Sequence, residues 1–134
     1  MGSIGGGNRN ITSIGEQEQY EDMGFGKVKN PLTQIPLKTS LEAIAKIPSD
    51  YEEQGEYKEV DISSLVSSQD YLFKNKLDYM RKTGVDSETS RGTKDEILVT
   101  RYKGMNILQD GTHRVILERE KGKKKIRVKF YDVQ

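Results

Sequence analysis

The run Asp110–Arg114, with the sequence Asp-Gly-Thr-His-Arg, brings together the side chains of this chain that are best suited to binding an anion. It lies between an apolar stretch typical of a strand and the apolar residues 115–117, which are typical of the start of a helix. A helix N-terminus presents unpaired amides and the positive end of its dipole, so it attracts phosphate or carboxylate. The predicted phosphate-binding residues are Gly111, Thr112, His113 and Arg114.

The same run supplies the candidates for catalysis. His113 is the only histidine in the chain, and its imidazole can bond a phosphate, bind a metal or transfer a proton. Arg114 can hold a phosphate through two hydrogen bonds, or it can pair with Glu118 one helical turn away. Asp110 would repel a phosphate unless a cation such as Mg²⁺ lies between them, and aspartate is also a common turn-forming residue. The catalytic candidates are therefore His113 and Asp110, and the cofactor to consider is a nucleotide, with or without Mg²⁺.

The segment 96–131 predicts the elements that position this run. Two short apolar stretches on either side of Lys103-Gly104 predict a β-hairpin. Thr112 is expected to cap the following helix, and Gly122 is expected to end it in the left-handed conformation. Residues 125–131 alternate basic and apolar side chains, which is typical of a half-buried strand. The predicted order is thus hairpin, turn, helix and strand.

The sequence ILVTRYKGMNILQDGTHRVILEREKGKKKIRVKFYDV resembles one half of the ParB/sulfiredoxin-like fold, which has this order of elements and a D-G-x-H-R type of turn. Residues 57–69 are similar to the first strand of that family and its glutamine-containing loop, so the resemblance covers roughly residues 56–133. It implies an α/β (α+β) fold with a small mixed sheet and a turn that faces the phosphates of a nucleotide or a nucleic-acid backbone. Members include partition proteins, a peroxiredoxin-repair enzyme, small-molecule kinases and phage proteins, so the fold leaves the function open. The residues that would face the ligand are Gly111, His113, Arg114 and, from the loop, Gln69.

A second candidate site is the basic stretch around the last predicted strand. The whole chain has a net charge of +1, but residues 114–134 contain eight Lys or Arg against three Asp or Glu. One face of the strand is basic and could neutralise several phosphates. This face lacks the interleaved aromatic residues that stack single-stranded bases, and lysines also protect solvated edge strands. The predicted nucleic-acid-binding residues are Lys123, Lys124, Lys125, Arg127 and Lys129.

The rest of the chain predicts an arm and a connector before the main domain. Residues 1–30 hold seven of the 13 glycines and few apolar side chains, so we expect a flexible arm that contacts neighbouring subunits. Residues 31–55 contain all three prolines and predict a connector with a short helix at 41–47, capped by Ser40. Residues 56–134 are the expected domain. Its further elements are a strand at 57–62, a loop at 63–69, a helix at 70–82 and a polar loop at 85–95.

Composition removes some function classes and leaves three. The chain has no cysteine, which excludes disulfides, thiolate metal sites and the sulfiredoxin reaction. The leading interpretation is a ParB-like module that binds phosphates of nucleotides or nucleic acid. Nuclease or NTPase activity stays open, with Glu59 or Asp61 as the candidate bases. The alternatives are a structural phage virion protein that self-associates through residues 1–30, and a toxin-type effector. No stretch reaches the length of a membrane span, so we expect no membrane partner and a cytoplasmic location, or a virion for a phage protein.

Overall fold

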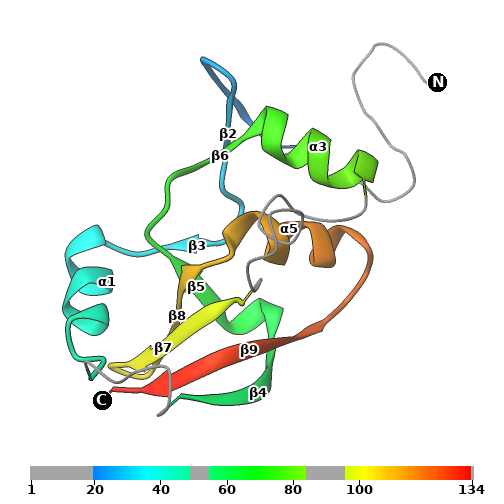
Figure 1. Cartoon of the computed structure of the whole chain (residues 1–134). Coiled ribbons are helices and arrows are strands. Elements are labelled where there is room, and N and C mark those ends of the chain that lie inside the picture. The colour runs from blue at the N-terminus through cyan, green and yellow to red at the C-terminus, as the bar shows by residue number, and fades with distance from the viewer. Residues whose placement is uncertain (1–19, 49–54, 84–95, 134) are drawn as a thin grey trace.

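The computed structural model describes residues 20–48, 55–83 and 96–133, which form a mixed α/β fold (Figure 1). In these ranges the chain forms two sheets and three α-helices, which confirms the expected fold class. The strands are β1 (Asp22–Gly24), β2 (Lys27–Lys29), β3 (Thr33–Gln34), β4 (Glu56–Asp61), β5 (Leu65–Ser67), β6 (Tyr71–Phe73), β7 (Leu98–Tyr102), β8 (Met105–Asp110) and β9 (Lys125–Asp132). The helices are α1 (Leu37–Ile44), α3 (Lys74–Thr83) and α5 (Thr112–Glu120), with a 3₁₀ turn, η1, at Ile62–Ser64.

The large sheet contains the predicted hairpin and closing strand. Its strand order is β3-β5-β8-β7-β9-β4, and the small sheet has the order β1-β2-β6. Lys103 and Gly104, at the β7–β8 turn, both have positive φ (51° and 75°), as the tightest hairpin turns require. β9 lies between β7, to which it is parallel, and β4, to which it is antiparallel. The basic strand is therefore internal, and β4 takes the edge position.

The large sheet has a core on each face. Neighbouring residues of a strand point to opposite faces, so Ile107 and Leu108 of β8 reach different cores. Leu108 packs in the main core with Val115 and Ile116 of α5, and this core extends to α3 and the small sheet. Ile107 packs on the other face with Ala43 of α1. The molecule thus has α1 on one side of the sheet and α5 on the other, and the small sheet and α3 share the α5 side.

No helix in the described ranges combines the length and the apolar composition that crossing a bilayer demands.

The structure corrects the boundary of the N-terminal arm. Residues 20–30 belong to the folded domain, because β1 and β2 form a hairpin that pairs with β6. Val28 of β2 is buried opposite Leu72 of β6, and this contact supplies the apolar burial that composition alone did not reveal. Residues 1–19 of the predicted arm and the predicted loop 85–95 lie outside the described residues.

Two predicted helices have different bounds. The connector helix begins after Pro36 and spans Leu37–Ile44, so Ser40 lies within the helix and does not cap it. The helix expected at 70–82 begins later, because its first residues form the strand β6 and α3 begins at Lys74. Similarly, the predicted loop 63–69 contains β5, which pairs in parallel with both β3 and β8. For β5 and β6, pairing with a distant strand overrides a weak local preference.

Candidate phosphate-binding site

The turn before α5 is closed by the packing of its own residues. Gly111 has φ of 91° and precedes the helix, while Thr112 is the first helical residue, is buried and does not act as the cap. A Cβ on Gly111 would lie 2.9 Å from Cγ1 of Ile97, so the missing side chain makes room for the core. The carboxylate of Asp110 accepts the Gly111 amide at 2.9 Å, which is the turn-forming role of aspartate.

His113 points into the protein and not towards an open surface, contrary to the expectation for a phosphate ligand. Its side chain is buried, and its Nε2 accepts the backbone amide of Phe73 at 2.9 Å. The two rings lie parallel, with an interplanar angle of 5° and centroids 6.2 Å apart. Burial, together with the charge of Lys76, lowers the pKa of His113 to about 4. His113 is therefore neutral near pH 7 and connects α5 to the edge of β6.

The other residues predicted to face a ligand at this turn also contact the rest of the protein. Gln69 donates to the carbonyl of Tyr71 at 2.9 Å, and its own carbonyl accepts the side-chain amide of Asn30 at 2.8 Å. Asn30 is buried and also donates to Ser67 Oγ, so it holds the β2–β3 connection against the β5–β6 connection. Arg114 is half-buried on α5. These contacts bring Gln69 and His113 to opposite ends of β6 and build no shared ligand site between them.

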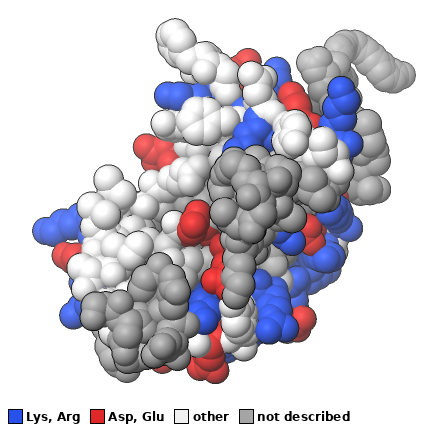
Figure 2. Space-filling model, viewed as in Figure 1, with Lys and Arg blue, Asp and Glu red and all other residues white. Residues whose placement is uncertain are grey.

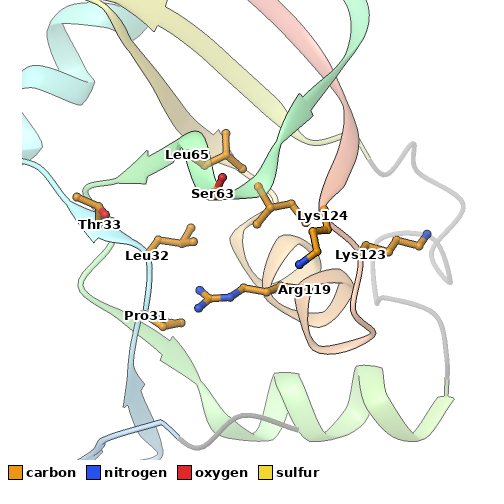
Figure 3. A pocket seen from close by; sticks show the side chains of 9 residues that line it. Pro31, Leu32, Thr33, Ser63, Leu65, Arg119, Lys123 and Lys124 are labelled. Carbon is orange, nitrogen blue, oxygen red and sulfur yellow. The ribbon is translucent and has the colours of Figure 1, made fainter. Parts of the chain in front are cut away.

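A hollow of about 360 Å³ lies at the other end of α5, where the helix passes η1 and the β2–β3 connection (Figure 3). Apolar side chains form its floor, and hydroxyl and cationic groups form its rim. Figure 3 shows the side chains of Arg119 and Lys124 extending into this space, whereas Lys123 extends away from it. The lining residues are Pro31, Leu32, Thr33, Ile62, Ser63, Leu65, Arg119, Lys123 and Lys124.

The charges around the hollow are distributed unevenly. Glu118 accepts Lys123 at 2.7 Å and Lys121 at 3.2 Å. Burial disfavours its ionised form, but the hydrogen bonds from these two lysines hold the pKa of Glu118 below its ordinary value. Lys124 is exposed and makes no ion pair with any residue in the described ranges, while its carbonyl accepts the Ile62 amide at 2.9 Å. The rim therefore keeps a cationic group whose charge is not matched by a nearby acid.

The basic face of β9 is largely matched by β4, which changes the predicted nucleic-acid surface. Lys125 forms an ion pair with Asp61 at 3.1 Å, and Glu59 lies directly opposite Arg127. The cationic groups of Arg127 and Lys129 lie over the Tyr57 ring, at 4.8 and 4.6 Å from its centroid, and Lys129 is buried. Tyr57 also donates to Glu96, and this hydrogen bond raises the Tyr57 pKa. Of the five predicted nucleic-acid-binding residues, Lys123 and Lys124 border the hollow. The other three, Lys125, Arg127 and Lys129, lie beside side chains of β4.

The pairing of β4 with β9 also determines where the two candidate hydrolytic bases lie. Glu59 and Asp61 lie on the exposed edge strand β4, beside cations of β9, and neither side chain lines the hollow. Among the described residues, no group of three or more His, Asp or Glu side chains is arranged to hold a metal ion.

Sequence reasoning missed Arg119, Thr33 and Ser63 as possible ligand-facing residues. A signal for Arg119 was present, because it opens the run Arg119–Lys125, in which five of seven residues are basic. Thr33 and Ser63 carried no such signal, because they come together only in the fold: β3 pairs with β5, and the Ile62 amide ties η1 to the Lys124 carbonyl. No protein-family model, curated protein or solved structure matches this chain.

Proposed function

We propose that this protein binds the phosphate groups of nucleic acid at the hollow beside the C-terminal end of α5. The observation that supports this proposal is the lining of the hollow, into which the cationic side chains of Arg119 and Lys124 extend and which includes no carboxylate. Arg119 and Lys124 approach the space from two different segments, so one phosphate could contact both. The hydroxyl of Ser63 lies on the same rim and could donate a further hydrogen bond.

Helix stability alone does not account for this arrangement. Cations in the last turn of a helix interact favourably with its dipole, which explains Arg119 and Lys121. Lys124 lies beyond the last turn of the helix, extends into the hollow and forms no ion pair with any acidic side chain in the described ranges. A bound anion would match this charge.

A polymer with several phosphates fits this surface better than a single nucleotide. Figure 2 shows Lys and Arg side chains gathered along the side of the molecule where α5 connects to β9. The segment Arg119–Lys125 carries five of these charges, and its acidic member, Glu120, is buried against Arg81. The hollow contains no histidine or carboxylate that could act as a general base, so the proposed activity is binding and not hydrolysis.

Lys124→Ala should weaken binding of nucleic acid roughly fivefold to tenfold and lower the salt dependence of affinity by about one phosphate contact. The measurement is fluorescence anisotropy with labelled DNA over a range of salt concentrations. Lys123→Ala is the matched control, because it removes the same charge from a side chain that is already paired with Glu118. Equal effects of the two variants, or no binding by the unmodified protein, would contradict the proposal.

A second candidate function is that of a structural component in a larger assembly. Leu37, Leu41 and Ile44 form an apolar stripe on α1, with exposed fractions of 60%, 55% and 40%. Figure 2 shows a largely uncharged surface on the α1 side of the molecule. Exposed apolar stripes of this kind are typical of protein interfaces. This observation favours an assembly role through α1, while the proposed contacts of residues 1–19 lie outside the described residues.

If α1 is an interface, the protein should exceed its monomer mass of 15.2 kDa in light scattering, and Leu41→Glu should return it to that mass. A charge placed in the centre of an apolar interface is left without a partner, so association should be lost. Lys38→Glu, on an exposed position of the same helix, should leave the mass unchanged. A monomer before and after the Leu41 change counts against this second function.

A further inference from the structure

The outer face of the small sheet combines cationic and aromatic side chains. Residues directly opposite each other on paired strands share a face, and Lys27 pairs with Phe73 while Lys29 pairs with Tyr71. The intervening pair, Val28 and Leu72, points the other way into the main core. The outer face therefore presents two lysines on β2 beside two aromatic rings on β6.

The rings on this face are held in fixed orientations. Tyr71 and Phe73 meet edge to face, with centroids 5.4 Å apart, and Lys27 Nζ lies 4.1 Å from the Tyr71 centroid. Phe73 is also parallel to the His113 ring, yet 47% of Phe73 is exposed to solvent. A large exposed aromatic side chain whose orientation is already set offers a stacking surface at little entropic cost.

Further cations lie immediately beside the rings. Phe73 is followed by Lys74, and Lys74 and Lys76 occupy the first turn of α3. Cations are unfavourable at a helix N-terminus, where the dipole is positive. On this face Lys29 lies 4.0 Å from the carboxylate of Glu21, but both side chains are well exposed, so the pair neutralises little.

We propose that this face binds single-stranded nucleic acid, with bases stacked on Tyr71 and Phe73 and phosphates contacting the lysines of β2 and of the first turn of α3. Aromatic rings interleaved with cations are the arrangement that recognises unpaired bases, because every base has a face that can stack. Bases in a duplex are already stacked and cannot reach such rings. This inference rests on the proposed nucleic-acid function, and it adds the preference for single strands. Lys29 is separated from Pro31 of the hollow by Asn30 alone, so one strand of nucleic acid has a short path between the two surfaces.

The test compares binding of an oligothymidylate longer than the ~16 nucleotides that one domain typically covers with binding of a duplex of equal length. The unmodified protein should prefer the single strand. The double variant Tyr71→Leu with Phe73→Leu keeps apolar side chains but removes the rings, and it should weaken single-strand binding at least about tenfold while duplex binding stays unchanged. Tyr79→Ala, which removes an exposed aromatic residue from α3, is the control and should change neither.

The outcomes separate this inference from the proposed function. If both forms of DNA bind and the double variant binds the single strand as well as the unmodified protein does, the stacking face is wrong and the hollow remains supported. If neither form binds, the proposed function fails and the stacking face fails with it. Circular dichroism and thermal unfolding of the double variant establish that it is folded. Phe73→Leu alone should cause more than half of the loss of single-strand binding that the double variant causes, because Phe73 is the more exposed ring. If the double variant unfolds, this single variant tests the stacking face in its place.

Discussion

Arg81→Met is expected to reduce the free energy of unfolding by about 3 kcal/mol, because it would leave a buried carboxylate without its cation. The Glu120 side chain is only 8% exposed and receives Arg81 Nε at 3.0 Å and Nη2 at 2.6 Å. Tyr20 donates to the same carboxylate at 2.5 Å. The hydrogen bond to Glu120 raises the pKa of Arg81, although burial acts in the opposite direction. Urea denaturation near pH 7 measures the loss.

The matched control for this prediction removes both charges. Replacing Arg81 and Glu120 together by Met should cost much less than the single change, since apolar pairs often replace buried ion pairs at little cost. The ion pair with Asp78 at 3.0 Å is more exposed and should contribute little to either value. If Arg81→Met is as stable as the unmodified protein, this bidentate contact does not hold α3 against α5.

The second prediction is that protonation of His113 destabilises the fold as the pH falls from about 6.5 to about 4. The pKa of His113 is lower in the folded state than in the unfolded chain, so the unfolded chain binds more protons in this window. Its contribution to stability is therefore complete above pH 6.5, is lost as the pH falls towards 4, and changes no further below that. The expected loss is on the order of 3 kcal/mol, because each unit of pKa difference is worth about 1.4 kcal/mol.

His113→Gln provides the comparison for this pH dependence. A glutamine oxygen can accept the Phe73 amide, but the side chain does not titrate, so the variant should lack this part of the pH dependence. Urea denaturation of both proteins is measured from pH 6.5 to pH 4. The carboxylates are the same in both proteins, so their contribution cancels in the difference between the two unfolding free energies. If that difference does not change with pH, His113 is not held in its neutral form by the fold.

The sequence predicted the elements whose signals are local. The β7–β8 hairpin followed from Lys103-Gly104, and the end of α5 followed from Gly122, because only a glycine easily adopts its φ of 88°. β9 followed from strict alternation of side chains. In contrast, β2 and β6 have three residues each, and they pair with each other across more than 40 residues of sequence, which no local pattern encodes.

The candidate site was harder to predict for the same physical reason. The motif around His113 correctly marked a strand-to-helix turn, but the direction of the ring depends on Phe73, which comes from another sheet. The alternation along β9 correctly placed the basic residues on one face, but it could not show that Asp61 and Tyr57 of β4 lie beside them. The hollow combines segments that meet only after the sheet order is fixed.

The position of β9 has a consequence for how the protein folds while it is being synthesised. β4 pairs only with β9 in the described sheet, so residues 56–61 have no partner until residues 125–132 have left the ribosome. The β7–β8 hairpin can form earlier, because its contacts are local. We expect the nascent chain to expose the charged strand β4 until β9 has emerged, and the acidic residues of β4 would keep it from pairing with other chains before then.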